Sequence, residues 1–583
     1  MNTAVPRKAW KYALWSLLAL VVLIPVWMLL SGYLLAVVRP DLVESDDVMR
    51  RVLVWGIAVP VLAVVAVASW RWSVAQNMAA QNAVVRSGEQ SGTRPDEAKP
   101  SGSNSHDYVL EVIGLGVTLD KYRQGKLWDA LSKGSPYASI REQDPKKYPW
   151  AEQDKLGQAD GRSGDALENG AKSLPIYFGM PTFTASAPVQ NDAYRDTPSN
   201  PLVGTAGGEQ IGMAFHLFVA AGSQSGERPD EVLNQVFSFF DQHPDVPYVV
   251  LTVDDGIRPR SDYSPPSTSR TRDGYYIPSM PDSSALFVLA RRERVDAIRA
   301  FAFDDINEDK YNGEDLNRYG VARKVMVSYV DLSERVPRPK GQPSRTPTVA
   351  EWLQETKALT QREDIYPKHV SLLNGLSEVK YPPRDFKPTP WFPVPWNKDQ
   401  LAAFDRLPTL GFIHRPVFVK TVDEHGQPLS RRDARAAALA AGWQAALATL
   451  PEAERKAAPA RVALATGGNV EQTIALTTVL DDWAAHGGRE LKRDQPTQWI
   501  DTDARLGNTG AATWFMQMAI GVMGSYNEGG ASAAINLRDP SEASIIFITP
   551  PSEKLRKTQH NAAGGEVWRS IVGPAIDPAN YQN

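Results

Sequence analysis

Two pairs of carboxylates are the residues whose spacing best suits chemistry. Asp254 and Asp255 follow Val246–Val253, a continuous apolar run typical of a buried parallel strand. Ligands bind at the carboxyl ends of such strands, where carboxylates can hold a metal or act as general bases. Asp501 and Asp503 are further carboxylates that could serve acyl or glycosyl transfer. For the first pair, the sequence favours the plainer alternative of a turn and a helix cap.

Other kinds of catalytic and cofactor site have little support. The chain has no cysteine, so it has no disulfide, no thiolate nucleophile and no cysteine-bound metal. None of the eight histidines lies two or four residues from another, so no local zinc-type cluster is encoded. Gly114 and Gly116 resemble the start of a dinucleotide fingerprint, but Leu119 occupies the position of its third glycine. No cofactor is therefore expected.

The overall composition is that of a globular protein. The chain has 583 residues, with 63 Lys and Arg against 67 Asp and Glu, and its formal charge is −4. A nucleic-acid-binding protein usually carries a basic domain or stripe, so nucleic acid is not an expected partner. Apolar residues make up 43% and charged residues 22%, which is ordinary globular usage. The length predicts roughly two to four domains.

Two uncharged segments near the N-terminus, 12–38 and 52–70, predict two membrane-spanning helices. A bilayer core of about 30 Å needs about 20 apolar residues in a helix, and the second segment only just reaches this length. The loop between them is short and acidic, so we expect it to be translocated and both termini to be cytoplasmic. The predicted location is the inner (cytoplasmic) membrane, with the soluble part facing the cytoplasm. Residues 87–106, rich in Ser, Gly, Pro and charge, predict a flexible linker.

The rest of the chain alternates between strand-like and helix-like segments, which predicts an α/β fold with parallel strand pairing. Apolar runs of strand length lie at 108–119, 246–253, 285–290, 461–466 and 544–549. Apolar residues with helical character lie at 125–131, 209–221, 231–240, 470–485 and 511–524.

The segment 381–396, YPPRDFKPTPWFPVPW, interrupts this alternation with prolines and aromatic residues. One interpretation, which the sequence favours, is a long surface loop packed by its own aromatics. The other is a polyproline-like arm that docks onto a partner. Aromatic side chains dominate the energetics of many interfaces. The candidate partner-binding residues are therefore the five large aromatics of this segment: Tyr381, Phe386, Trp391, Phe392 and Trp396.

Five stretches, taken in order, resemble ketosynthases of the thiolase-like superfamily. They are VIGLGVT with LWDALSKG, LVGTAGGEQIGMAFHLFVAAG, RDGYYIPSMPDSSALFVLARRERV, VALATGGNVEQTIALTTVLDDW and LGNTGAATWFMQMAIGVMGS. The resemblance implies a two-halved domain with αβαβα layers. It also implies that Gly207, Ala465 and Asn508 stand where the family has a nucleophilic cysteine and two catalytic histidines. None of these side chains can act as nucleophile or base, so the resemblance implies a pseudoenzyme.

Three stretches also resemble the type VI lipase adapter family, whose members load a phospholipase effector onto a type VI secretion spike. They are GLGVTLDKYRQGKLWDAL, YPKHVSLLNGLSE and residues 507–548. The resemblance implies an adapter. With the two predicted membrane helices and the missing ketosynthase catalytic residues, the expected function is that of a membrane-tethered, catalytically inert adapter. Its expected partners are a lipase effector, a secretion-spike protein and the lipid bilayer, and a homodimer stays open.

The chain is expected to have five parts. They are two transmembrane helices (1–75), a flexible linker (76–106), a first α/β half (107–333), a Pro- and aromatic-rich connecting insertion (334–410) and a second α/β half (411–583). Two other functions stay open. One is a transferase-like enzyme with a non-cysteine mechanism that uses the carboxylates named above. The other is a membrane-bound protein that binds an acyl ligand. A deep pocket with convergent carboxylates of shifted pKa would favour the enzyme.

Overall fold

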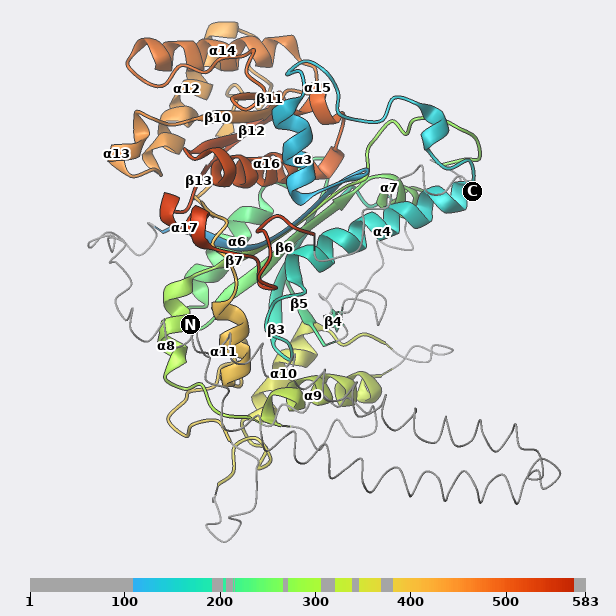
Figure 1. The fold of residues 1–583 in the computed structure, drawn as a ribbon, viewed down its shortest axis with the longest axis vertical. Helices are drawn as coiled ribbons and strands as arrows, with labels where there is room; N and C mark the ends of the chain where they lie inside the picture. The colour runs from blue at the N-terminus through green and yellow to red at the C-terminus, as the bar shows by residue number, and fades with distance from the viewer. Residues whose placement is uncertain are drawn as a thin grey trace, which may run out of the picture. The chain divides into compact units, whose positions relative to one another are not determined.

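The computed structural model describes residues 108–190, 203–205, 213, 215–265, 271–305, 320–337, 345–368 and 381–570. Every described residue belongs to the second of the chain's two units, Asn104–Asn583. This second unit is built on a mixed sheet of 13 strands, with helices packed on its faces (Figure 1).

The first half of the sheet has five main strands. They are β1 (Leu110–Leu119), β3 (Gly179–Ser186), β5 (Leu217–Ser225), β6 (Tyr248–Asp255) and β7 (Ser283–Ala290), in the spatial order β5-β3-β6-β7-β1. β3 is parallel to β5 and β6, whereas β7 is antiparallel to β6 and β1. β7 is buried along its whole length, as expected for an apolar strand covered by helices on both faces.

The second half repeats this plan. Its strands are β8 (Gly411–Ile413), β10 (Arg461–Ala465), β11 (Trp499–Asp501), β12 (Ser532–Asp539) and β13 (Glu542–Thr549), in the order β11-β10-β12-β13-β8. β10 is parallel to β11 and β12, and β13 is antiparallel to β12 and β8. An antiparallel pairing of β1 with β8 joins the halves. Three short strands add to the sheet: β2 (Tyr122–Arg123) pairs with β1, β4 (Val203–Thr205) with β5, and β9 (Val417–Lys420) with β13.

Alternate strand residues face different hydrophobic cores, and this reveals the layers. Phe287 and Leu289 of β7 face a central core, whereas Leu286 and Val288 face an outer one. The central core also takes residues from the strands of the second half and from three helices, α3 (Gln124–Lys133), α6 (Val232–Gln242) and α16 (Thr513–Glu528). Nearly every residue of α16 is buried, because this helix packs against strands of both halves.

Outer helices complete the layers. α4 (Glu152–Ala171) covers the first half, and α12 (Arg432–Ala448) and α14 (Val470–Ala485) cover the second. α4 lies so close to β1 that a Cβ at Gly116 would be 1.8 Å from the carbonyl oxygen of Ala166. Gly114 and Gly116 therefore serve helix-to-strand packing within β1, and not a nucleotide-binding turn. The resulting order of layers is α, β, α, β, α, which is the two-halved α/β fold that the ketosynthase resemblance implied.

The connection between the halves packs on the outer side of the first half. It contains α8 (Arg292–Arg299), α9 (Val321–Arg335), α10 (Val349–Leu359), α11 (Lys398–Asp405) and the irregular segment 381–396. α10 begins with a capping box, in which Thr348 and Glu351 each bond the other's backbone N–H. The remaining described helices are short: α7 (Ile257–Tyr263), α13 (Glu452–Arg455), α15 (Thr502–Leu506), α17 (Glu553–Thr558), and the 3-10 turns η2 (Pro145–Lys147) and η5 (Gly510–Ala512).

Most predicted elements are present within a few residues of their expected bounds. α14 begins at Val470, as predicted, because the side chain of Asn469 caps its first backbone N–H groups. The helix predicted at 209–221 is wrong, since residues 217–222 belong to β5 and pair with β3. Periodicity alone does not separate a short apolar strand from a buried helix, and here the pairing with a neighbouring strand decides.

The prediction that this fold includes two membrane-spanning helices is corrected. Within the described ranges, no helix is both long enough and apolar enough to cross a bilayer. α4 has 20 residues but is rich in charged and polar side chains, and the apolar α16 has 16 residues, short of the roughly 20 that a span needs. The predicted segments 12–38 and 52–70 lie outside the described residues.

Candidate functional site

The carboxyl ends of strands from both halves lie around the turn η5, and this is where the sequence predicted chemistry. Asp255, at the end of β6, is fully buried. Its Oδ2 accepts hydrogen bonds from the backbone N–H of Ala511 at 2.7 Å and from Arg260 at 2.6 Å. A Cβ on Gly510, whose φ is +54°, would be 2.1 Å from this same oxygen. The backbone of the second half thus approaches Asp255 too closely for any residue but glycine.

Arg260 neutralises the buried charge of Asp255. Its guanidinium also binds both carboxylate oxygens of Glu227, at 2.6 and 2.9 Å. A buried carboxylate is costly unless it is paired and hydrogen-bonded, and Asp255 meets both conditions. Asp255 therefore links the two halves and presents no free base.

Asp254 has the electrostatic signature that the sequence could not supply. Burial, with a smaller contribution from the nearby Asp282, raises the pKa of this carboxyl to about 7. Its Oδ1 accepts a hydrogen bond of 2.5 Å from Ser284. Asp282 in turn forms an ion pair with Arg162, on α4. A shifted pKa of this kind is a mark of functional sites, but buried structural networks also produce it.

The other two carboxylates hold the local backbone. Asp501 caps α15 by accepting the N–H of Ala504 at 3.0 Å. Asp503 accepts the N–H groups of Thr466 and Gly467 at 2.7 and 2.8 Å, and so fixes the turn that follows β10. Asp501 and Asp503 thus serve as a helix cap and as the acceptor that fixes a turn, which are common structural roles of aspartate.

The positions implied by the ketosynthase resemblance carry no acid–base group. Ala465 ends β10 and is fully buried. Asn508 lies between α15 and η5, where its Oδ1 accepts from the N–H of Gly510 at 3.0 Å and from Arg538 at 2.6 Å. Arg538 also donates to Thr513 at 2.6 Å. Gly207 lies outside the described residues.

The aromatic arm, which we define as residues 381–396, is packed into the protein itself. Phe386, Phe392 and Trp396 belong to the outer core of the first half, with 8%, 1% and 2% of their surface exposed. Trp391 is partly buried against Phe239, at a ring distance of 5.0 Å, and Tyr381 is also partly buried. The three buried aromatics cannot contact a partner in this conformation.

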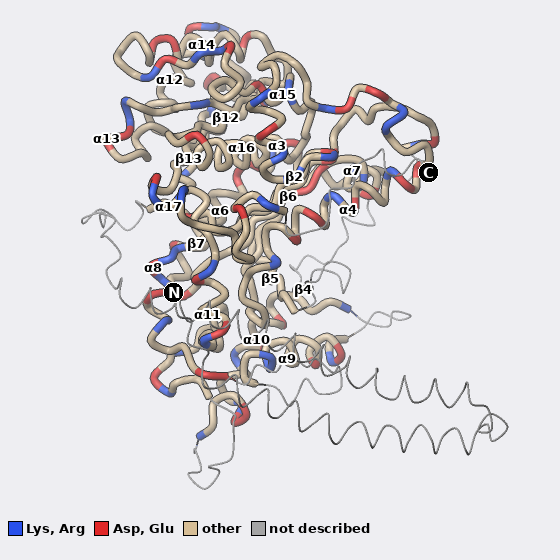
Figure 2. The backbone as a smooth tube through the Cα atoms, in the orientation of Figure 1, with Lys and Arg blue, Asp and Glu red and all other residues tan. Residues whose placement is uncertain are grey.

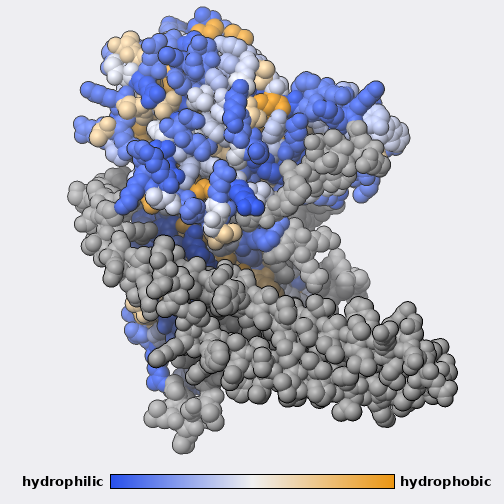
Figure 3. Space-filling model, in the orientation of Figure 1, coloured by the Kyte–Doolittle hydropathy of each residue, from blue (hydrophilic) through white to orange (hydrophobic). Residues whose placement is uncertain are grey.

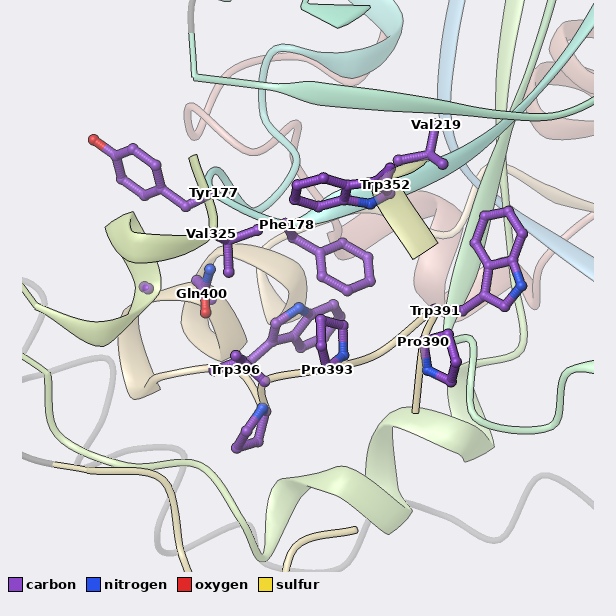
Figure 4. Close-up of a pocket in the computed structure, with 14 residues that line it drawn as sticks. Tyr177, Phe178, Val219, Val325, Trp352, Pro390, Trp391, Pro393, Trp396 and Gln400 are labelled. Atoms are coloured by element: carbon purple, nitrogen blue, oxygen red, sulfur yellow. The ribbon is translucent and has the colours of Figure 1, made fainter. Parts of the chain in front are cut away.

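A narrow crevice follows the arm where it meets the first half (Figure 4). Phe178, Trp352 and Trp396 line it, and Gln400 adds a polar group. The space open to the centre of a water molecule is only about 20 Å³, roughly what one water needs. The arm therefore fills this apolar site and leaves no room for an acyl chain.

Two larger hollows have mixed polar and apolar linings. One, of about 350 Å³, lies between α9, α11 and residues 172–177, and its charged residues are Lys172, Asp305, Arg323, Asp399 and Arg406. The other, of about 450 Å³, lies over α6 and is lined mainly by polar side chains. A hydrocarbon chain in either place would contact charged or polar groups as well as apolar ones, and the burial of those groups would carry a cost. Asp254 lines neither of them.

Two family models match the chain, and they match the two halves separately. The model described as "Type VI lipase adapter protein Tla3, N-terminal" matches residues 108–273. The model described as "Type VI lipase adapter protein Tla3, C-terminal" matches residues 410–550. Together the matches cover more than half of the chain. The chain belongs to the type VI lipase adapter family.

Solved structures similar to this adapter-family chain are ketosynthases and related synthases. A ketosynthase from module 6 of the bacillaene synthase of Bacillus subtilis 168 has 8% identity and a TM-score of 0.35, over 77% of this chain and 71% of that one. The ishigamide ketosynthase/chain length factor has 9% identity and a TM-score of 0.35, over 76% and 100%. The 3-oxoacyl-(acyl carrier protein) synthase III of Pseudomonas aeruginosa PAO1 has 12% identity and a TM-score of 0.27, over 76% and 99%. TM-scores this low carry no argument about function.

The family matches bear on the arm as well. Residues 274–409, which include the whole arm, lie between the two matched segments. In this lipase adapter chain, most of the arm's large aromatics are thus buried. The arm also lies outside the residues that the family models match. Partner binding by Tyr381 and Trp391, which stay partly accessible, remains a prediction.

Sequence reasoning missed the arginines that complete the strand-end site. Arg538 reaches Asn508, 30 residues away in the chain, and Arg260 reaches Glu227, 33 residues away. Neither arginine belongs to a motif with a fixed spacing, so only the folded chain shows the contacts.

Proposed function

We propose that this chain is a non-catalytic adapter that binds a lipase effector for delivery by type VI secretion. The observation that carries the proposal is the match of both α/β halves to models of the lipase adapter family. The site around η5 supports the non-catalytic part, because each polar group described there has a structural partner.

Ketosynthase chemistry needs an activated thiolate and bases that move protons. The chain has no cysteine, Ala465 offers no polar atom, and Asn508 has its carbonyl oxygen engaged by two donors. The guanidinium of Arg538 stays charged at physiological pH and cannot act as a base. These residues supply neither nucleophile nor proton acceptor.

Buried hydrogen bonds between the two halves also support a binding role, because they favour a rigid domain. Asp230, near the start of α6, is buried and accepts hydrogen bonds from Asn536 at 2.9 Å and Ser544 at 2.7 Å, both in the second half. Asp255 links the halves in the same way through Ala511. Two buried links between the halves disfavour relative motion, and a preorganised surface binds a partner at a lower entropic cost.

The test is direct binding followed by secretion. The purified chain, mixed with the type VI lipase whose gene lies nearest to its own, should form a complex in isothermal titration calorimetry. Deleting the gene of this chain should abolish secretion of that lipase, and a spike protein should co-purify with the complex. Unchanged lipase secretion after deletion would refute the adapter role.

The non-catalytic part has its own test. Incubation with acyl thioesters should leave the mass of the intact protein unchanged, and no thiol should be released above the rate without protein. An acyl-enzyme adduct, or turnover that depends on Asp254, would refute this part and favour a non-cysteine transferase.

A further inference from the structure

An exposed lobe of the first half carries large aromatic side chains. We define the aromatic lobe as residues 134–151 together with residues 271–279, which lie side by side at the edge of the domain near the start of α4 (Figure 1). Tyr137, Trp150 and Tyr275 expose 72%, 52% and 52% of their surface. These are the exposed large aromatics of the described chain; the other exposed large apolar residues there are valines.

Hydrogen bonds hold the two segments of the lobe together. The N–H of Gly274 donates to the carbonyl oxygen of Trp150 at 2.8 Å, and the N–H of Glu152 donates to Asp273 at 2.9 Å. Farther along, Arg141 donates to the carbonyl oxygen of Pro278 at 2.7 Å. The exposed aromatics therefore stand on fixed backbone, and little conformational entropy would be lost when a partner covers them.

A buried lysine lies beneath the lobe. Lys155, on α4, is 1% exposed, and its Nζ donates to the carbonyl oxygens of Trp150 at 2.8 Å and Arg272 at 3.0 Å. The same ammonium lies 4.8 Å from the centre of the Tyr276 ring. Burial lowers the pKa of Lys155, so the folded chain bears a cost for this contact. The contact joins the two surface segments that display the exposed aromatics.

The lobe also lies largely within what the family shares. Tyr137 and Trp150 fall inside the segment matched by the N-terminal lipase adapter model, 108–273, and Tyr275 follows it by two residues. The arm 381–396 falls outside both matched segments. A surface that serves the family's common task should lie within the matched residues; most of the lobe does, Trp150 included, whereas the arm does not.

Charge on the lobe is nearly balanced, and this restricts the partner. The lobe holds four cations and three anions, for a formal charge of +1, and both signs occur along these loops (Figure 2): Arg141, Lys146, Lys147 and Arg272 against Glu142, Asp144 and Asp273. The visible described surface is mainly hydrophilic, with only small apolar patches (Figure 3). Contact through the lobe would thus depend on aromatic burial and only weakly on charge.

We infer that the aromatic lobe is the surface on which this adapter holds its lipase effector, with Trp150 and Tyr275 as the principal contacts. The occupant is a folded lipase that offers an uncharged, apolar hollow to these two side chains. The inference rests on the proposed adapter function, which supplies the partner. Large aromatics on a rigid support are the residues that most often dominate the binding energy of an interface.

The experiment compares variants of the full chain for binding the nearest-encoded type VI lipase by calorimetry. Trp150→Ala with Tyr275→Ala should weaken binding about 30-fold or more. Two matched controls, Val330→Ala and Val470→Ala, remove other exposed apolar side chains, which are 39% and 67% exposed, and should change binding less than about twofold. Thermal unfolding of each variant should match the unaltered chain, because none of these side chains belongs to a hydrophobic core.

Salt dependence and mass complete the test. Raising NaCl from about 50 to about 500 mM should change the dissociation constant less than about threefold, because charge on the lobe is nearly balanced. If the unaltered chain binds the lipase and the double variant binds equally well, the lobe inference is overturned while the adapter function stands. If the unaltered chain does not bind, the adapter function itself fails. Light scattering tests a second copy of this chain as the occupant. If the double variant loses self-association but binds the lipase as before, the inference is overturned in favour of that second copy.

Discussion

The aromatic arm and the aromatic lobe have opposite relations between composition and exposure. The arm is the richest aromatic stretch in the sequence, yet its Phe386, Phe392 and Trp396 are core residues. The sequence of the lobe has no distinctive composition, yet its Trp150 is half exposed on a backbone held by hydrogen bonds. The comparison teaches that an aromatic-rich sequence shows only that a segment can be buried. Whether it packs inside its own chain or against a partner depends on which residues the fold places beside it.

The partners of the arm explain its burial. Phe178, from the segment before β3, places its ring 5.2 Å from Phe392 and 5.6 Å from Trp396. Trp396 also lies 5.3 Å from Phe404 on α11. Aromatic pairs at such distances add about 0.5–1.5 kcal/mol to the gain from area burial. The arm thus stabilises the outer side of the first half. The sequence favoured a surface loop packed by its own aromatics, but the arm also packs against aromatics of other segments.

The largest expected effect is on the arm. Trp396→Ala should lower the free energy of unfolding by about 3–5 kcal/mol, because it removes a buried indole and leaves a cavity. Denaturant unfolding followed by circular dichroism measures this difference. A loss below about 1 kcal/mol would mean that the arm packs loosely, and it would erase the contrast with the lobe.

The second effect belongs to the lobe and has the reverse pattern. Trp150→Ala alone should weaken effector binding by about 2 kcal/mol while changing the free energy of unfolding by less than about 0.5 kcal/mol. Trp391→Ala is the matched control in the arm, and it should change stability more than binding. Should Trp391→Ala reduce binding as much as Trp150→Ala, the arm and the lobe would form one partner surface.

The third effect tests how the lobe is held. Lys155→Met keeps the length of the side chain but removes two charge-assisted hydrogen bonds to carbonyl oxygens. We expect a loss of about 1–2 kcal/mol in stability, smaller than the gross value of two such bonds because the cost of burying the ammonium also disappears. Hydrogen exchange should accelerate at 145–155 and 271–279 and stay unchanged in α16. Protection that is unchanged in the lobe would mean that Lys155 does not hold it.

The fold was largely predictable because strong local patterns agreed with the tertiary structure. The continuous apolar run of β6 and the Asn469 cap of α14 each suffice to place an element. The failure at 209–221 has a local cause as well. Residues 217–222 form a short apolar run that fits a helix or a strand, and they become a strand through pairing with β3.

The candidate site was less predictable because its contacts join distant parts of the chain. Asp255 and Ala511 are 256 positions apart, and Asp230 and Asn536 are 306 apart. The sequence identified the carboxylates, but it could not show which of them would form ion pairs or have a shifted pKa. Trp150 and Gly274 illustrate the same limit for the lobe, since nothing in either segment indicates that their backbones meet.

The smallest expected effect is a pH dependence confined to the arm. His243 lies against Phe239 and Trp391, with ring distances of 4.3 and 5.6 Å, and burial lowers its pKa below the usual 6.5. The folded chain therefore binds fewer protons at this site than the unfolded chain when the pH falls below 6.5. The contribution of His243 to stability is complete above that pH and is lost as the pH falls toward the folded-state pKa. Because the ring is partly exposed, we expect the loss to stay below about 1 kcal/mol.

In denaturant unfolding at pH about 7.5 and about 5.5, His243→Gln should lose less stability on acidification than the unaltered chain, whereas Trp150→Ala should lose the same amount. Equal losses in the unaltered chain and in His243→Gln would show that acid does not weaken the packing of the arm.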